Sequence, residues 1–421
     1  MDEDWQQPAT NTGLTGIHTL TEKQLEKVTK NAESLAYFHY RLHRTDVEAM
    51  IREDGDFILR KGTRNDVEGF TVSVRWNGRI MHFPVHWVSQ QCCFESKSFA
   101  LIQNLVHHHN TSGQPVTVRS GAKLIKARAR QVWELLERDI DLGKPLGQGA
   151  FGCVYQGTWT RTDGIPVQCA VKTLENISPT AEGGNVLENA RNEMLREART
   201  MRELNGHPNL VRAFGVTIDR ELPYAIMEFL SGGSLEKRLR QTSTSPKIKV
   251  KILLEVARGL CYINRSGYIH RDVACRNILF DRLESGEIGI VKITDFGLAR
   301  KLDHTGSFKG PEDEKIPVVW TAFESLVNNV WFLKSDVWSM GVIIWEVFAN
   351  GAKPYCDQET LDKPAVIQHL KEGNRLKASP SMQMPPGVER LMGECMFTNV
   401  AMRPPMYYVC STLQDELAAL V

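Results

Sequence analysis

The pattern of apolar and polar residues predicts two groups of secondary structure, separated by a basic, helix-prone stretch at 126–138. Between residues 34 and 123, strand-like runs alternate with two helical stretches. In the second group, residues 167–172 alternate as a half-buried strand, and residues 340–345 form an apolar run that a buried helix would explain. The pattern therefore favours two folded domains joined by a short linker.

The length of the chain supports the same division, because 421 residues exceed what one ordinary hydrophobic core holds. We expect a polar, flexible segment at 1–33, a first domain at 35–125, a linker at 126–139 and a second domain at 140–421. Trp133 is the apolar anchor of the linker.

Composition narrows the class of protein. The apolar fraction of 42% suits globular domains, and a net charge of +1 gives no bulk attraction to nucleic acid or to an anionic membrane. The first residues lack a signal peptide, and no apolar run is long enough to cross a bilayer. Nine cysteines without paired spacing suit a reducing compartment. We expect a cytoplasmic protein with no nucleic-acid partner and no direct membrane insertion.

Two motifs carry the chemistry of the second domain. Residues 270–277 read His-Arg-Asp-Val-Ala-Cys-Arg-Asn, and residues 295–297 read Asp-Phe-Gly. Together they form the compound signature of protein kinases, in which Asp272 accepts the proton of the substrate hydroxyl. Asn277 and Asp295 would hold Mg²⁺ against the phosphates of ATP.

A glycine-rich loop precedes these motifs. Gly147, Gly149 and Gly152 have the spacing that lets a backbone approach phosphates closely. The same spacing occurs in dinucleotide-binding folds, but there a helix follows, whereas residues 152–156 are strand-like. Lys172, at the end of the strand 167–172, would then reach the α- and β-phosphates.

Lys172 needs an acidic partner on a nearby helix. Residues 195–201 are helical in pattern and contain Glu197, which we assign as that partner. Glu193 lies one helical turn earlier and would share the same face, so it remains an alternative.

The second domain resembles the protein tyrosine kinases. Residues 272–277 match their catalytic loop, and residues 316–324 match the platform for a tyrosine side chain. Serine/threonine kinases typically carry a Lys two residues after the base, and Arg276 replaces that Lys. Val319 and Phe323 depart from the family, which has a basic residue and a proline there. The departures concern substrate placement rather than phosphate chemistry.

The resemblance also implies the nucleotide site and some structural residues. Besides Lys172, the residues expected to contact ATP are Leu146, Gly147, Gly149, Gly152, Val154, Ala170, Met227, Glu228, Leu230 and Leu279. Asp336 would brace the catalytic loop, and Glu324 would pair with Arg403.

The activation segment, 295–324, contains no tyrosine. Tyrosine kinases commonly carry one whose phosphate pairs with the arginine that corresponds to Arg271. The acids at 312–314 could supply a permanent negative charge, although such acids are more often only solvated, and Thr305 and Ser307 remain candidate phosphorylation sites. We expect activity without tyrosine autophosphorylation in this segment.

The first domain resembles the SH2 domains. Residues 57–62 match the strand that carries the phosphotyrosine-binding arginine, and residues 70–76 with 80–83 match the central hairpin. Arg60 lies at an inward-facing position of an apolar strand, where a buried guanidinium needs an anion. An internal salt bridge in a purely structural domain is the alternative.

Carried over residue by residue, Arg60 would bind the phosphate with both arms of its guanidinium. Arg44 would approach from the first helix, and His82 would support the pocket. Pro84 replaces a common lysine, and residues 61–62 replace the usual Glu-Ser, so weakened affinity is expected.

The order of these domains resembles the Fes/Fer non-receptor tyrosine kinases, without the membrane-bending N-terminal module of that family. This resemblance implies an α+β chain: an SH2 domain, with a central antiparallel sheet flanked by two helices, followed by a bilobal protein kinase domain. It implies ATP and Mg²⁺ as cofactors, protein tyrosine substrates and tyrosine-phosphorylated partners, with recruitment from the cytoplasm to the inner face of the plasma membrane. Trp133 would brace the Glu197 helix. The alternatives are a weakly active scaffold that binds phosphotyrosine and nucleotide, and a serine/threonine kinase, which Arg276 disfavours.

Overall fold

The computed structural model describes residues 19–42, 44–64, 67–148, 152–174, 184–220, 222–312, 314–355 and 362–420. The chain divides into two compact units, one of residues 1–140 with 216–224 and the other of residues 141–215 with 225–421. Val216–Tyr224, in the predicted second domain, therefore clusters with the first unit. Each unit is described by itself below.

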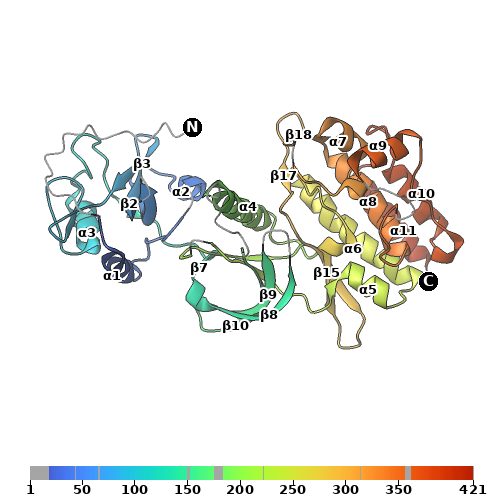
Figure 1. Ribbon diagram of the computed structural model, residues 1–421, viewed down its shortest axis with the longest axis horizontal. Coiled ribbons are helices and arrows are strands. Elements are labelled where there is room, and N and C mark those ends of the chain that lie inside the picture. Colours follow the sequence, from blue (N-terminus) through green and yellow to red (C-terminus); the bar gives the residue numbers. More distant parts are fainter. Residues whose placement is uncertain are drawn as a thin grey trace. The chain divides into compact units, whose positions relative to one another are not determined.

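The first unit is built on an antiparallel hairpin sheet (Figure 1). Strands β1 (Asp56–Arg64), β2 (Val67–Trp76) and β3 (Arg79–Pro84) pair in sequence, and β6 (Lys126–Ala127) adds to β1 in parallel. Helices α2 (Arg44–Met50) and α3 (Ile102–Ser112) belong to this unit, as does the pair β4 (His86–Val88) and β5 (Gln91–Cys93). This is the predicted arrangement of an antiparallel sheet with two helices.

Strand β1 is covered on both faces of the sheet. Phe57, Ile58 and Leu59 are consecutive, so their side chains point alternately to opposite faces, yet each is at most 1% exposed. Ile58 packs with Val47 of α2 in one apolar cluster. Burial on both faces fixes the register of β1 and therefore the position of Arg60.

At the two ends of this unit, the described residues form structure that the sequence pattern does not predict. Helix α1 (Glu22–Ala32) occupies part of the segment expected to be flexible, and the Thr21 backbone N–H donates to Gln24 Oε1 at its start (2.9 Å). The linker forms no helix: it contributes β6, then β7 (Glu134–Leu135) and a 3₁₀ turn, Glu137–Asp139. Pairing of β6 with β1, and of β7 with β11 (Ala213–Thr217), overrides the helix propensity of the linker.

The linker is held to the first unit by a buried ion pair. His39 Nδ1 lies 2.6 Å from Glu134 Oε2, both side chains are 0% exposed, and His39 Nε2 lies 2.8 Å from the Arg128 carbonyl. Beside this pair, Trp133 packs against the apolar cluster that contains Val47 and Ile58. Bracing of the Glu197 helix by Trp133 remains a prediction.

The second unit begins with a sheet and one long helix. Strands β8 (Ile140–Gln148), β9 (Cys153–Thr160), β10 (Pro166–Lys172) and β12 (Ala225–Glu228) lie in the order β12-β10-β9-β8. Helix α4 (Gly184–Glu203) carries Glu197. Strand β11 begins in this unit and ends in the other.

The rest of the second unit is mainly helical, as a bilobal kinase domain requires (Figure 1). Its helices are α5 (Leu235–Gln241), α6 (Pro246–Arg265), α7 (Phe323–Asn328), α8 (Leu333–Phe348), α9 (Lys363–Lys371), α10 (Pro386–Cys395) and α11 (Met406–Ala419). Short strands form the sheet β13 (Gly233–Ser234), β15 (Ile278–Arg282) and β16 (Ile288–Ile293), and the pairs β14 (Tyr268–Ile269) with β17 (Arg300–Lys301) and β18 (Phe308–Lys309) with β19 (Val330–Trp331). The remaining 3₁₀ turns are Cys275–Asn277, Val318–Trp320 and Pro380–Met382. Helix α8 is buried over most of its length, as the apolar run at 340–345 predicts.

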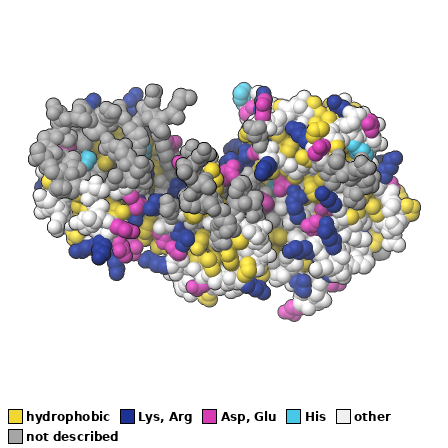
Figure 2. All heavy atoms as spheres, in the orientation of Figure 1, with side chains coloured by type: hydrophobic (Ala, Val, Ile, Leu, Met, Phe, Trp, Pro, Cys, Tyr) yellow, Lys and Arg dark blue, Asp and Glu magenta, His cyan; other side chains and the backbone are white. Residues whose placement is uncertain are grey.

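Among the described helices, none has the length and apolar character needed to cross a membrane. On the visible face, Lys and Arg side chains occur at several places with Asp and Glu among them (Figure 2). The mixture agrees with the net charge of +1.

Glu324 and Arg403 form the predicted buried ion pair, with Nη1 to Oε1 at 2.8 Å and exposures of 8% and 1%. Glu324→Gln leaves the guanidinium buried without its counter-charge, so we expect the free energy of unfolding of this unit to fall by about 3–5 kcal/mol in urea titrations. Glu236→Gln is the matched control, because Glu236 pairs with Arg240 near the surface of α5. That control should cost at most about 0.5 kcal/mol. Equal losses in the two variants would contradict the prediction.

Candidate active site

One buried carboxylate fixes the backbone of the catalytic loop. Asp336, at the start of α8, accepts the backbone N–H groups of His270 (2.9 Å) and Arg271 (3.1 Å), and the side chain of Asn264 (3.2 Å). These bonds hold Arg271 at φ +70°, a backbone conformation that non-glycine residues seldom adopt. Burial raises the pKa of Asp336 despite the bonds that it accepts. The geometry matches the predicted role of Asp336 as a brace.

The next residue, Asp272, lies among partners from its own loop. Asn277 Nδ2 donates to Asp272 Oδ2 (2.7 Å) and to its backbone carbonyl (2.9 Å), and the Arg276 guanidinium bonds the other carboxylate oxygen. Burial raises the pKa of Asp272, while Arg276 acts to lower it. The carboxylate is therefore oriented by two side chains of the predicted motif.

Arg276 also contacts the segment predicted to receive the substrate. Its guanidinium carbon lies 4.3 Å from the centre of the Trp320 ring, and Trp320 Nε1 donates to Glu346 Oε2 (3.1 Å). The same Glu346 oxygen accepts the Cys275 backbone N–H (3.0 Å). Glu346, which the sequence motifs did not single out, thus ties the platform to the catalytic loop.

Lys172 and Glu197 are paired. Lys172 Nζ donates to Glu197 Oε2 at 2.7 Å and to Oε1 at 3.0 Å, and Glu197 is 7% exposed. The alternative acid, Glu193, is exposed. Burial acts to lower the pKa of Lys172, but Glu197 and Asp295 outweigh it, so the pKa is raised and the ammonium stays charged.

Asn277 and Asp295 offer oxygen ligands suited to Mg²⁺. Asn277 donates its amide N–H groups to Asp272, which leaves its carbonyl oxygen as an acceptor. Asp295 has a φ of +64° and lies two residues after the end of β16. Mg²⁺ commonly takes one or two protein oxygens and completes its shell with phosphates and water, so this small donor set fits the ion.

The expected nucleotide residues lie on or beside β8, β9, β10, β12 and β15. Ala170 and Met227 are direct partners across β10 and β12, and each is 8% exposed. Leu230 is buried, while Leu146 is 38% exposed beside Gly147. Gly149 lies outside the described residues.

The remaining nucleotide residues lie on β9, β12 and β15. Val154 and Leu279 are half-buried. The Glu228 side chain is bonded to Lys292 Nζ (2.8 and 2.9 Å), a partner that sequence reasoning missed. We therefore expect Glu228 to contact adenine through its backbone atoms and not through its side chain.

Two of the three residues predicted for the phosphotyrosine pocket of the first unit, Arg60 and His82, have described side chains. Arg60 Nε donates to Ser73 Oγ (3.1 Å), and Ser73 Oγ lies 2.9 Å from His82 Nδ1. Ser73, which is 0% exposed, was not predicted, although the pairing of β2 with β3 places it opposite His82. The Arg44 side chain lies outside the described part of the chain.

The activation segment gives Arg271 a carboxylate partner. Glu314 lies 2.6 Å from Arg271 Nη2, whereas Glu312 is exposed and Asp313 is outside the described residues. Val319, at the first departure from the family, is 5% exposed within the 3₁₀ turn, and Phe323 begins α7. The segment therefore forms ordered structure at the positions that depart from the family.

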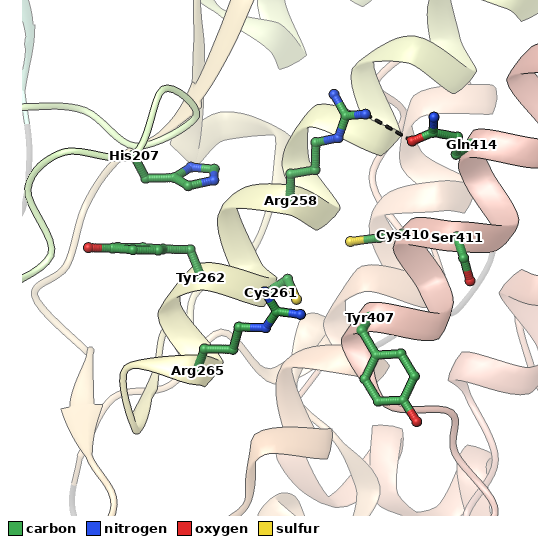
Figure 3. Close-up of a pocket in the computed structure, with 9 residues that line it drawn as sticks. All are labelled: His207, Arg258, Cys261, Tyr262, Arg265, Tyr407, Cys410, Ser411 and Gln414. Carbon is green, nitrogen blue, oxygen red and sulfur yellow. Dashed lines mark hydrogen bonds between the residues drawn. The ribbon is translucent and has the colours of Figure 1, made fainter.

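A separate hollow of about 430 Å³ lies between α6 and α11 (Figure 3). On one side the rings of His207 and Tyr262 stack 5.0 Å apart, and on the other Arg258 donates to Gln414 (3.0 Å). None of the residues predicted for phosphoryl transfer lines it. It is distinct from the candidate active site.

Comparison with known proteins agrees with this geometry. Residues 140–413 match the family model of protein tyrosine and serine/threonine kinases, and residues 37–109 match the SH2 domain. Human tyrosine-protein kinase Fer is 32% identical over 387 residues, which are 91% of this chain and 44% of Fer. The transforming protein Fps of avian sarcoma virus (strain PRCII) is 33% identical over 88% of this chain and 65% of its own length. Fer-related kinase 1 of Caenorhabditis elegans is 30% identical over 92% of this chain and 95% of its own length. The chain thus spans under half of Fer and under two thirds of the viral protein.

Gly152 tests the packing of the glycine-rich loop. A Cβ at this position would lie 1.8 Å from the Thr173 carbonyl oxygen, whereas a Cβ at Gly147 would meet nothing within 4 Å. We expect Gly152→Ala to destabilise the second unit by about 1–3 kcal/mol, because backbone must move to admit the methyl group. Gly147→Ala is the matched control, and thermal unfolding without nucleotide is the measurement. A Gly147→Ala variant that loses as much stability would refute the packing argument.

Proposed function

We propose an activity for this chain on the basis of its family. The chain belongs to the protein tyrosine kinases that carry an SH2 domain, with Fer and Fps among its relatives. We propose that it transfers the γ-phosphoryl group of ATP to tyrosine in proteins. The observation that carries the proposal is the Lys172–Glu197 pair, since a charged lysine held by a helix carboxylate is what binding of the α- and β-phosphates needs.

Each polar group of the site has a part in the transfer. Lys172 orients the phosphates, and Mg²⁺ held by Asn277 and Asp295 would neutralise the charge on their oxygens. Asp272 accepts a hydrogen bond from the substrate hydroxyl and takes its proton as the oxygen attacks the γ-phosphorus, while the bond from that phosphorus to the bridging β-phosphate oxygen breaks and ADP leaves. Because little covalent chemistry is required, the residues act mainly by position and charge.

The choice of tyrosine rests on Arg276 and the platform. Arg276 bonds Asp272 and lies against Trp320, so it joins the base to the segment that would receive the substrate ring. The likeness of residues 272–277 and 316–324 to the tyrosine kinases favours a phenol over a serine hydroxyl as the group that Asp272 meets. Burial of Val319 supports a structural rather than a charge-reading role for that position.

The SH2 domain is proposed to recruit the kinase to tyrosine-phosphorylated proteins. Arg60 is oriented through Ser73 and His82, as a guanidinium that receives phosphate oxygens must be. The eight cysteines of the described residues are all free thiols, which supports a reducing compartment. We therefore place the protein in the cytoplasm, with recruitment to the inner face of the plasma membrane through such partners.

The activity is tested with purified protein, magnesium and ATP on a mixture of tyrosine, serine and threonine peptides. We expect phosphotyrosine only, and a loss of about 100-fold or more in Asp272→Asn, because a general base commonly contributes that much. Asp415→Asn, on the exposed face of α11, is the control and should keep the wild-type rate. Phosphoserine as the product would contradict the tyrosine assignment, and nucleotide binding without turnover would favour the scaffold.

The SH2 proposal is tested by fluorescence polarisation with a degenerate pool of phosphotyrosine peptides. Arg60→Lys keeps the charge but loses the two-armed geometry, so we expect affinity to fall about 10- to 100-fold. Arg79→Lys, on the exposed end of β3, should bind as the wild type does. If Arg60→Lys binds as tightly as the control, Arg60 does not hold the phosphate.

A further inference from the structure

Three arginines converge on the backbone where the Asp-Phe-Gly motif ends, at Gly297 and Leu298. Arg196 Nη2 and Arg300 Nη1 both donate to the Gly297 carbonyl, at 3.2 and 3.0 Å, and Arg271 Nη1 donates to the Leu298 carbonyl at 3.2 Å. These arginines come from α4, β17 and the catalytic loop. Three guanidinium groups at one turn repel one another unless an anion lies among them.

Glu314 supplies a negative charge to two of the three. Its Oε2 lies 2.6 Å from Arg271 Nη2 and its Oε1 lies 2.8 Å from Arg300 Nη2, so one carboxylate bridges both guanidinium groups. The side chain of Arg271 is 1% exposed, and those of Arg300 and Glu314 are 14% exposed. Charged hydrogen bonds shielded from water in this way are stronger than surface pairs.

Aromatic rings close the other side of the cluster. The Arg271 guanidinium lies 3.9 Å from the centre of the Trp331 ring and 5.0 Å from that of Phe308, and Arg300 lies 5.7 Å from Phe308. Phe308 and Trp331 are themselves partners in the β18–β19 pair. Burial, together with the charge of Arg196, lowers the pKa of Arg300 to about 10, while Glu314 acts to raise it.

The Glu314 carboxylate pairs with Arg271, and tyrosine phosphorylation within the activation segment cannot supply a negative charge there. Residues 295–324 include no tyrosine, and Glu314 is the described acid that meets Arg271. We infer that Glu314 is a built-in substitute for an activation-segment phosphate, which holds Arg271 and Arg300 in place without modification of the segment. The inference rests on the proposed kinase function, and it implies a kinase that is competent as synthesised.

The cluster connects three parts of the site. Arg271 directly precedes Asp272, Gly297 ends the Asp-Phe-Gly motif, and Glu314 lies two residues before Ile316, where the substrate platform begins. Through its two arginine partners, the Glu314 carboxylate therefore fixes the relative positions of the catalytic loop, the backbone after Asp295 and the substrate platform. Glu314 touches no reacting atom, so it is a positioning residue.

The test compares Glu314→Gln with Glu312→Gln. Both remove one negative charge from the same loop, but Glu312 is exposed. We expect Glu314→Gln to lower kcat for a tyrosine peptide at least about tenfold, since one charged hydrogen bond is worth that much, and Glu312→Gln to leave it within about twofold. Glu314→Asp keeps the charge on a shorter side chain and should restore part of the loss, with the Kd for ATP unchanged in all three variants.

A second readout does not need catalysis. Trypsin cleavage after Lys309 and Lys315, which flank the anchored stretch and are exposed, should be faster in Glu314→Gln than in Glu312→Gln. Equal kcat values and equal cleavage rates in the two variants would overturn the inference. If the wild-type protein phosphorylates no peptide, the proposed function fails, and the cleavage rates still decide whether Glu314 anchors the segment.

Discussion

The bonds from the buried Asp336 carboxylate to the catalytic loop are the constraint on which the rest of the site depends. They hold the backbone at His270 and Arg271 and so keep Arg271 at a positive φ. From that backbone the Arg271 side chain reaches Glu314, while the next residue, Asp272, meets Asn277 and Arg276. One carboxylate at the start of α8 thus sets the directions of two functional side chains.

Charges in the second unit are used to join segments distant in sequence. Lys172 joins β10 to α4, Glu314 joins the activation segment to the catalytic loop, and Glu324 joins α7 to Arg403, three residues before α11. Each pair must repay the cost of removing charge from water, which it does through several bonds to one partner or two. The net gain in stability from such a pair is therefore small. Its main effect is to fix the positions of the segments that it joins, and phosphoryl transfer depends on those positions.

Local patterns in the sequence predicted the elements and the catalytic set because strands and compound motifs depend on residues near one another. They assigned Glu197 as the partner of Lys172 but left Glu193 as an alternative, since both lie on one helical face and only the packing of α4 exposes Glu193. Glu314 was visible only as one of three acids, because its partner is 43 residues away. Ser73 could have been found from the hairpin register. The strands of the linker could not, because their partners belong to other parts of the chain.

We infer that the catalytic loop and the activation segment are arranged by charges already present in the chain. The most direct measurement is the progress curve of phosphatase-treated enzyme with peptide, magnesium and ATP, followed from the first seconds. If these charges suffice, the curve is linear at the full rate, with no phosphate on Thr305 or Ser307 afterwards. A lag that preincubation with magnesium and ATP removes, accompanied by a phosphate on either residue, would contradict it.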